Sequence, residues 1–241
     1  MQYGPKIVTN GLVFCVNAAD KISYAGSGTT WKDISTSNVS GASCLVGGPT
    51  FNSANGGYIT TGAYNSGKYF TWGTGITPVN FTSSNFTISF VFKPNSDMFS
   101  GGQMGILGYG RENTSGYYMM ISKIASNKIS FFTSQSGAIQ STTSSDFSGY
   151  SGKWVFFTIV RNGSSIKLYA NNVDITETAG THTNPVSNTT IALTLGICTQ
   201  SSGALSFSAY ADYASFIIYN RALSASELTQ NYTSQRLRFG L

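Results

Sequence analysis

Short apolar or alternating segments recur along this chain, and glycine, asparagine or serine separates each one from the next. Many short strands with turn residues between them are typical of a sandwich or barrel built from antiparallel pairs. We predict strands at residues 12–16, 57–61, 86–92, 105–108, 117–122, 128–133, 154–160, 165–169, 191–197, 204–208 and 215–219. The pattern therefore predicts an all-β fold.

The composition excludes the main alternatives to that fold. Charged residues make up only 10% of the chain, against about 25% in an ordinary globular protein. Serine, threonine, asparagine and glycine take their place, and these residues are poor helix formers, so an all-helical fold and a coiled coil are excluded. The 16 Phe, 14 Tyr and 3 Trp are far more than disordered segments carry.

The clearest local unit covers residues 153–175. Segment 154–160 is apolar at both alternating sets of positions except at Thr158, which predicts a central strand covered on both faces. Asn162 and Gly163 predict a hairpin turn, because both tolerate positive φ. Asn171 and Asn172 predict a second turn after a half-exposed strand.

One helix is expected near the C-terminus. Ser224 and Glu227 have the spacing of a capping box, in which each side chain bonds the backbone N–H of the other residue. Leu228 and Tyr232 would then share one face of a helix that runs to about Gln235. Because we find no linker and no internal repeat, residues 1–241 are expected to form a single domain.

The charge, cysteine and hydropathy patterns bear on partners and on location. The net charge is +5, but the basic residues are scattered, so we expect no nucleic-acid partner. We find neither a signal-peptide apolar region nor a run of about 18 apolar residues, so secretion and membrane insertion are not expected. Three cysteines cannot all pair within one chain, and Cys15 in an apolar run is expected to be a buried thiol in a reducing cytoplasm.

Two motifs at opposite ends of the chain carry a family resemblance. The opening residues 11–20 (GLVFCVNAAD) and 24–35 (YAGSGTTWKDIS), and the closing residues 219–227 (YNRALSASE), resemble concanavalin A-like (laminin-G-like) jelly-roll domains. Segments 48–59, 85–92 (NFTISFVF), 152–154 and 162–171 also match strands of that family. The resemblance implies a two-sheet antiparallel jelly-roll sandwich with adjacent chain ends.

The chain ends extend this resemblance to proteins of tailed bacteriophages, in which such domains are virion structural components. This implies a non-enzymatic exterior head decoration or fibre-like appendage, located in the virion and assembled in the host cytoplasm. The expected partners are other virion proteins of the capsid or fibre, and further copies of this chain. Residues 1–10 and 236–241 would be terminal attachment segments, since an added segment often pairs with a neighbour's sheet or groove. Their candidate contact residues are Tyr3, Ile7, Arg236, Arg238 and Phe239.

A second function, glycan binding by a tail adhesin, rests on one loop rich in aromatic and amide residues. Sugars offer an apolar ring face and a rim of hydroxyls, which aromatic rings and amides recognise. Loop 62–75 (GAYNSGKYFTWGTG) holds both kinds of side chain. The alternative is that these rings pack on the sandwich edge or at a protein–protein contact. The candidate carbohydrate-binding residues are Tyr64, Asn65, Tyr69 and Trp72 in this loop, with Tyr109 and Tyr150 outside it.

Polysaccharide hydrolysis is the least favoured function. Retaining glycosidases need two carboxylates about 5–5.5 Å apart, and no two acidic residues lie two or four positions apart within a predicted strand. Asp174 and Glu177 are three apart in an expected turn. The one histidine, His182, is expected in an exposed loop with no partner for a triad or a metal. No catalytic residue is therefore assigned.

No cofactor is expected either, although many relatives bind calcium through aspartates. Asn17 replaces the usual first-strand aspartate, residues 61–65 (TGAYN) replace the usual Asp-Gly-x-x-Asp loop, and residues 214–215 lack the acidic residue expected there. Calcium affinity depends on ligand charge, so these departures count against the family site. The alternative is a calcium site at Asp20 or Asp33.

Overall fold

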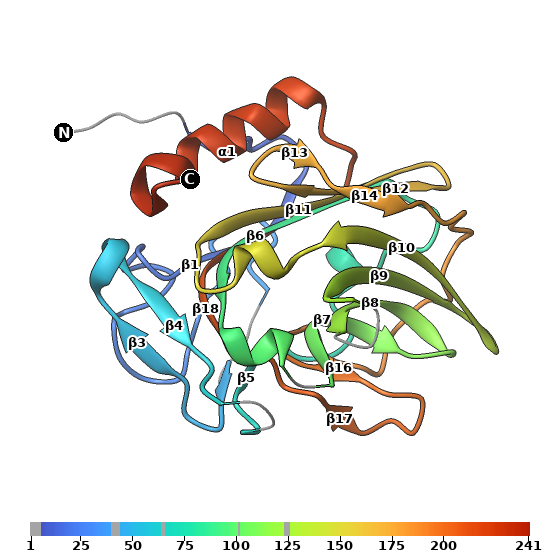
Figure 1. The fold of residues 1–241 in the computed structure, drawn as a ribbon, viewed down its shortest axis with the longest axis horizontal. Helices are drawn as coiled ribbons and strands as arrows, with labels where there is room; N and C mark the ends of the chain where they lie inside the picture. Colours follow the sequence, from blue (N-terminus) through green and yellow to red (C-terminus); the bar gives the residue numbers. More distant parts are fainter. Residues whose placement is uncertain (1–5, 40–43, 64–65, 101, 123–125) are drawn as a thin grey trace.

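The computed structural model describes residues 6–39, 44–63, 66–100, 102–122 and 126–241. Two antiparallel sheets pack face to face, and one helix lies outside the first sheet (Figure 1). The predicted two-sheet antiparallel sandwich with a C-terminal helix is confirmed. In the described part of the chain, no helix has the length and apolar character needed to cross a membrane.

The first sheet contains the central strands of the domain. In spatial order it consists of β13 (Val173–Asp174), β12 (Ser165–Ala170), β11 (Val155–Asn162), β6 (Phe86–Pro94), β18 (Ala211–Tyr219), β4 (Tyr58–Thr60) and β3 (Thr50–Asn52), with β1 (Leu12–Asn17) also paired to β18.

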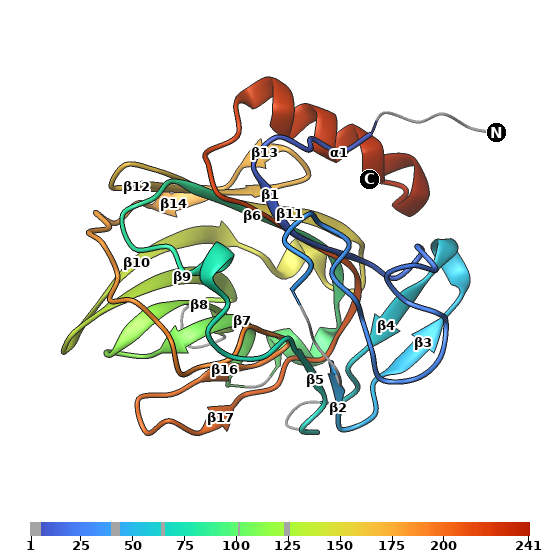
Figure 2. The ribbon, with the colours of Figure 1, turned by 180° about the vertical axis from the view of Figure 1, so that it is seen from behind.

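The second sheet packs against the inner face of the first, as the view from behind also shows (Figure 2). Its order is β14 (Thr176–Thr178), β10 (Ala138–Asp146), β9 (Lys128–Gln135), β8 (Ser115–Ser122), β7 (Gln103–Arg111), β15 (Thr194–Leu195), β5 (Tyr69–Thr71) and β2 (Leu45–Val46). A short strand β16 (Cys198–Thr199) pairs with β17 (Leu205–Ser206) and, in parallel, with β7. Single 3-10 turns occur at Ala54–Gly56, Thr77–Val79, Ser96–Phe99 and Ser148–Tyr150.

Strand β11 is apolar on both faces because each face packs against a different layer. Phe157 and Ile159 point into the main core between the sheets. Phe156 and Val160 point outward, where they join the apolar clusters beneath the helix. The strand lies between β12 and β6, so the expectation of a covered central strand is confirmed.

Of the two predicted hairpin turns that follow β11 and β12, one lies at the predicted residues and the other does not. Asn171 and Asn172 adopt φ of 49° and 66° between the paired residues of β12 and β13, as expected. The first turn lies one residue further along than predicted. Asn162 still pairs with Ser165, so the turn residues are Gly163 and Ser164, and Gly163 takes the positive φ of 62°.

Helix α1 (Ala225–Phe239) begins at the predicted capping box. The Glu227 N–H donates to the Ser224 hydroxyl at 3.4 Å, and the Ser224 N–H donates to the Glu227 carboxylate at 2.9 Å. The helix runs one turn past the expected end at Gln235, because Phe239 gains a buried position against Trp154, with ring centres 4.7 Å apart. Gly240 then ends it in the left-handed conformation, with φ of 67°.

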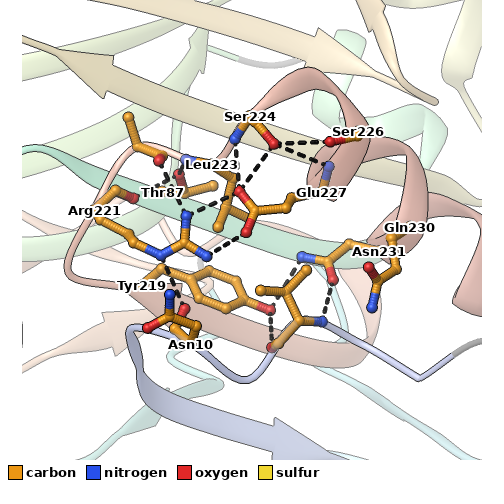
Figure 3. A network of polar contacts seen from close by, with 12 residues as sticks. Asn10, Thr87, Tyr219, Arg221, Leu223, Ser224, Ser226, Glu227, Gln230 and Asn231 are labelled. Carbon is orange, nitrogen blue, oxygen red and sulfur yellow. Dashed lines mark hydrogen bonds and ion pairs between the residues drawn. The ribbon is translucent and has the colours of Figure 1, made fainter.

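A closed ring of three hydrogen bonds holds the helix, the last strand and the N-terminal segment together (Figure 3). The Val8 N–H donates to the Asn231 side-chain oxygen at 2.8 Å, and the Asn231 amide donates to the Tyr219 hydroxyl at 3.0 Å. That hydroxyl donates in turn to the Val8 carbonyl oxygen at 2.9 Å. Because Asn231 and Tyr219 are fully buried, this ring fixes how the helix lies on the sheet.

All three cysteines are buried thiols, and none of them forms a disulfide with another described residue. Burial raises the pKa of Cys15 to about 12, with a smaller effect from nearby Asp33, and it raises the pKa of Cys198 to about 12. The expectation that Cys15 is a buried thiol is confirmed. Such protonated thiols are poor nucleophiles and poor metal ligands.

Candidate functional site

The loop expected to bind sugar places its tryptophan in the core of the sandwich. Trp72 is 1% exposed, and its indole N–H donates to the Trp31 carbonyl oxygen at 2.8 Å. Tyr109 on β7 is fully buried, and its hydroxyl lies 3.0 Å from the Ile76 carbonyl oxygen and 3.3 Å from that of Asn188. Neither ring can offer a face to a sugar, so the assignment of Trp72 and Tyr109 as sugar contacts is wrong. The physical reason is that the pairing of β5 with β2 and β15 directs Trp72 into the core, whereas Tyr109 lies on β7 within the second sheet and points into the same core.

The other candidates of that assignment have different positions. Tyr64 and Asn65 lie outside the described residues. Tyr69 is half-buried on β5, and its contact with sugar stays a prediction. Tyr150 is half-buried next to a surface cavity described below.

The apolar residues of the terminal segments belong to the domain itself. Ile7 packs against an apolar cluster on the outer face of the first sheet. Phe239 is 7% exposed and packs on Trp154. Ile7 and Phe239, which we named as candidate attachment contacts, thus pack within the domain, and an attachment role of the terminal segments stays a prediction. Phe239 is buried because the helix continues past the predicted end at Gln235.

The basic residues of the C-terminal segment divide into one bound and one free side chain. The Arg238 guanidinium donates to the Asn17 side-chain oxygen at 3.1 Å and to the Asn55 and Gly57 carbonyl oxygens. Burial lowers the pKa of Arg238 to about 10. Arg238 is thus engaged inside the domain, whereas Arg236 is exposed. Tyr3 lies outside the described residues.

The two carboxylates closest in sequence do not form a catalytic pair. Asp174 lies on β13 of the first sheet and pairs with Lys167 at 2.9 Å. Glu177 lies on β14 of the second sheet and pairs with Lys128. Each carboxylate is therefore held by a lysine of its own sheet.

The aspartates considered for calcium have structural partners. The Asp33 side chain is fully buried, and its two oxygens accept hydrogen bonds from the backbone N–H groups of Cys15, Ser35 and Val39 and from the Ser35 hydroxyl. These four donors occupy the oxygens that a cation would need. Among the described residues, no group of three or more His, Cys, Asp or Glu side chains is placed to hold a metal.

His182 is buried, and the expectation of an exposed loop histidine is wrong. Its ring nitrogens lie 2.8 Å from the Thr133 hydroxyl and 2.9 Å from the Thr142 hydroxyl, on strands β9 and β10. Burial, with a smaller contribution from the nearby Arg161 charge, lowers the pKa of His182 to about 4. The ring is therefore neutral at pH 7, and the two hydroxyls satisfy both of its nitrogens.

A surface cavity of about 330 Å³ lies where β6, β18 and β4 run side by side. Lys93, Asp212 and Thr60 stand opposite one another in the strand register. The Lys93 ammonium lies 2.7 Å from one Asp212 oxygen, and the Thr60 hydroxyl donates to the other at 2.6 Å. The remaining lining residues are Pro94, Asn95, Gly152, Tyr210 and Ala211.

Aromatic rings hold Lys93 on its other side. Its ammonium lies 5.4 Å from the centre of the Tyr58 ring and 5.3 Å from that of the Trp154 ring. These two rings meet edge to face with centres 5.2 Å apart. The ammonium is thus placed between a carboxylate and two π faces, which fixes its direction without burying it.

A second cavity of about 430 Å³ adjoins the first and shares Gly152 with it. It is lined by Gly149, Tyr150, Gly152, Lys153, Trp154, Asn171, Phe239, Gly240 and Leu241. We call the two cavities together the outer groove. It combines aromatic rings with lysine, carboxylate, amide and hydroxyl groups, which is the chemistry that recognises a polyhydroxylated ring.

We missed the polar part of this groove from the sequence because we ended one strand two residues too early and began another four residues too late. We predicted strands at 86–92 and 215–219, whereas β6 continues to Pro94 and β18 begins at Ala211. The extra residues bring Lys93 opposite Asp212. Alternation extends to Lys93, which continues the outward-facing positions of β6, but not to Asp212, because the register of β18 shifts between Tyr213 and Ser215 and reverses the two faces.

The sequence matches a known protein family. A family model for the concanavalin A-like lectin/glucanases superfamily matches residues 65–229. A search of curated proteins finds no match.

Solved structures with a similar fold include binding domains of clostridial toxins. The botulinum neurotoxin serotype D ligand-binding domain, in complex with N-acetylneuraminic acid, has a TM-score of 0.68 and 17% identity, over 95% of this chain and 52% of that chain. The mosaic serotype C/D receptor-binding domain has a TM-score of 0.71 and 16% identity, over 95% and 52%. The binding domain of Paraclostridial Mosquitocidal Protein 1 has a TM-score of 0.67 and 18% identity, over 92% and 52%. This chain therefore spans about half the length of these domains, and at such identities the likeness shows the fold alone.

Proposed function

Since this chain belongs to the concanavalin A-like lectin/glucanases superfamily, we propose that it is a non-enzymatic domain that binds carbohydrate in the outer groove. The observation that carries the proposal is the placement of Lys93 between Asp212 and two aromatic rings. A fixed ammonium and carboxylate side by side offer a donor and an acceptor to vicinal sugar hydroxyls. The neighbouring rings offer contact to the apolar face of a sugar.

The size and shape of the groove favour an oligosaccharide over a single sugar. Each of the two cavities is within the volume range of small-molecule sites, which starts at about 300 Å³. One sugar unit would contact Asp212, Asn95 and Tyr210. The next unit would pass Gly152, where the lack of a side chain leaves room, and contact Trp154 and Tyr150 in the second cavity.

The similar structures support carbohydrate recognition as a use of this fold. The serotype D domain is described in complex with N-acetylneuraminic acid, and the type C domain with cell entry that depends on two ganglioside molecules. The mosaic C/D domain holds tetraethylene glycol on its Hcn sub-domain. These domains are about twice as long as this chain, so their function is carried over here as a proposal.

The groove favours binding over hydrolysis. Asp212 is the one carboxylate side chain among the described residues that line it. A glycosidase of either type needs two carboxyl groups across the scissile bond. Asp212 is also neutralised by Lys93 and bonded to Thr60, which suits an acceptor of sugar hydroxyls.

The resemblance of both chain ends to bacteriophage proteins supports a second candidate, a virion structural component. The domain would then be displayed on the exterior of a particle as a head decoration or a fibre-like appendage, in contact with capsid or fibre proteins or with copies of itself. The outer groove would serve attachment to a host glycan. Mass spectrometry of purified particles tests this role, since a virion component is recovered in fixed stoichiometry and a free protein is lost on purification.

The glycan proposal is tested with a glycan array followed by calorimetry on each hit. Asp212→Asn should weaken binding about tenfold or more, because a hydrogen bond to a charged group contributes roughly 1.5–3 kcal/mol. Asn95→Ala should weaken it less. Glu177→Gln is the matched control, since it removes a carboxylate from another lysine pair, neither residue of which lines the groove. Binding that Asp212→Asn and Asn95→Ala leave unchanged, or an array without hits, would overturn the proposal.

A further inference from the structure

A separate pocket of about 300 Å³ lies at the other end of the sandwich. The pairing of β11 with β6 shows how far this pocket lies from Lys93. Arg161 pairs with Phe86 at the start of β6, whereas Val155 pairs with Phe92, the residue before Lys93. Six residues of strand correspond to about 20 Å. The pocket is lined by Ser83, Arg161, Gly163, Ser164, His182, Thr183 and Asn184. We call it the Arg161 pocket.

Arg161 is a buried charge that points inward from β11. The residue is 2% exposed and shares the inward-facing set of positions with Phe157 and Ile159. Its guanidinium donates to the Gly163 carbonyl oxygen at 3.0 Å, to the Thr82 carbonyl oxygen at 3.1 Å and to the Asn184 side-chain oxygen at 3.1 Å. A guanidinium has five N–H groups, so each terminal nitrogen retains one N–H beyond these three bonds.

The partners of Arg161 are all neutral. Every Asp and Glu of the chain lies in the described part, and none of them forms an ion pair with Arg161. Burial of a charge is costly unless it is paired, and here burial lowers the pKa of Arg161. The pocket thus holds a desolvated positive charge whose counter-ion the chain does not supply.

His182 shapes the same pocket without adding a second charge. Its ring is held by two threonine hydroxyls between the sheets and is neutral at pH 7. The hydroxyls of Ser83, Ser164 and Thr183 complete the lining. One cation surrounded by hydroxyls and an amide is suited to an anionic group attached to a polyhydroxylated body.

We infer that the Arg161 pocket binds the carboxylate of an acidic sugar residue. The planar guanidinium fork matches a carboxylate geometrically, and a volume of about 300 Å³ suits one monosaccharide. The serine and threonine hydroxyls and the Asn184 amide would contact the sugar hydroxyls. This site is independent of the outer groove, because it lies at the opposite end of the first sheet and on its other face.

The decisive variant supplies the missing counter-ion from within the chain. Asn184 is exposed, and its side-chain oxygen already contacts Arg161, so Asn184→Asp should form an internal ion pair and occupy the fork. This variant is expected to fold, to unfold at a higher temperature than the wild type, and to lose carboxylate binding at least tenfold. Asn52→Asp is the matched control. It adds the same charge on exposed strand β3 and keeps the side-chain oxygen that accepts from the Ala54 N–H.

Calorimetry would use N-acetylneuraminic acid, glucuronic acid, glucuronamide and sodium sulfate as probes, with the His182 ring protons followed by NMR. We expect at least one sugar acid to bind and shift the His182 signals, and glucuronamide to bind at least tenfold more weakly than glucuronic acid. Binding of sulfate without either sugar acid, no binding of any probe, or sugar-acid binding that Asn184→Asp leaves unchanged would overturn the inference. Asp212→Asn separates the two sites, since it should weaken groove binding and leave the His182 response intact.

Discussion

Arg221 and Glu227 form a two-bond ion pair across the start of helix α1, with nitrogen–oxygen distances of 2.9 and 2.5 Å (Figure 3). The same carboxylate accepts from the Ser224 N–H, so one side chain caps the helix and ties it to the end of β18. The Arg221 side chain also reaches the Asn10 carbonyl oxygen at 3.0 Å. The closing sequence motif of residues 219–227 therefore holds the start of the helix to the first sheet and to the N-terminal segment.

Glu227→Gln is expected to lower the free energy of unfolding by about 1 kcal/mol. The effect is modest because both side chains keep 27% exposure, and water screens such pairs. Arg221 holds the pKa of Glu227 at about 2, below its unfolded value. This contribution is therefore present above about pH 4.5 and is lost as the pH falls towards 2.

Urea unfolding of Glu227→Gln and the wild type at pH 7 and pH 3 measures this effect. The difference between the two proteins should shrink at pH 3. Ser226→Ala is the control, since Ser226 bonds only the Ser224 hydroxyl in this network. An equal difference at both pH values would contradict the role of the ion pair.

We predict that the free energy of unfolding falls in mild acid because of the one histidine, His182. His182 has a pKa of about 4 in the folded protein and an ordinary value of 6.5. Between these values the unfolded chain binds a proton that the folded chain does not, so stability rises with pH across this window. We expect a loss on the order of 2 kcal/mol as the pH falls from 6.5 to 4.

Thermal unfolding across that pH range checks the prediction against the variant His182→Gln. The variant should be less stable than the wild type at pH 7, because the histidine packs between Thr133 and Thr142. It should also lose the pH dependence above pH 5, since the chain has one histidine. A wild-type curve that is flat between pH 5 and 6.5 would show that His182 is not buried as described.

Trp72 is expected to affect stability rather than sugar binding. Trp72→Phe removes the N–H that donates to the Trp31 carbonyl oxygen and leaves a buried acceptor without this partner. Such a change costs about 1–3 kcal/mol, with a further cost for the space vacated by the smaller ring. Chemical denaturation gives the cost, and binding to any glycan found on the array should be unchanged in the folded variant. Loss of glycan binding at unchanged stability would show that Trp72 does contact the sugar.

The three thiols are expected to be unreactive in the folded protein. They are buried, and burial raises the pKa of Cys15 and of Cys198 to about 12, so the reactive thiolate is scarce at pH 8. Ellman's reagent should titrate all three only after denaturation. Rapid reaction of one thiol in buffer, with Cys44→Ala and Cys198→Ala used to identify it, would contradict its burial.

The central strands could be predicted because their apolar pattern is local. Strand β11 has apolar residues on both faces, and the helix begins at a capping box that four residues define. These signals need no knowledge of the partner strand. The boundaries were less accurate, since terminal residues such as Lys93 are held by pairing with residues far away in the chain.

Strand β10 was missed because its inward-facing residues are polar. Thr142 and Ser144 point into the sandwich, where one bonds His182 and the other accepts from the Ile129 N–H. A segment reading AIQSTTSSD has no apolar periodicity to detect. The buried positions of His182 and Arg161 escaped prediction for the same reason, because only the assembled sheets bring their neutral partners to them.

The hydrogen bonds between the N-terminal segment and helix α1 determine how the domain would respond to mechanical tension. Lys6 and Val8 are bonded to Gln230 and Asn231 of the helix, so the two ends of the fold are fastened to each other on one side of the sandwich. A force applied at the ends would load these side-chain bonds first and one after another, as in unzipping. The strand ladders would bear load only after the helix had peeled away. The domain would therefore lengthen first at the helix, and peeling would remove Phe239, Gly240 and Leu241 from the outer groove, whereas the Arg161 pocket, which no residue of the helix lines, would keep its walls.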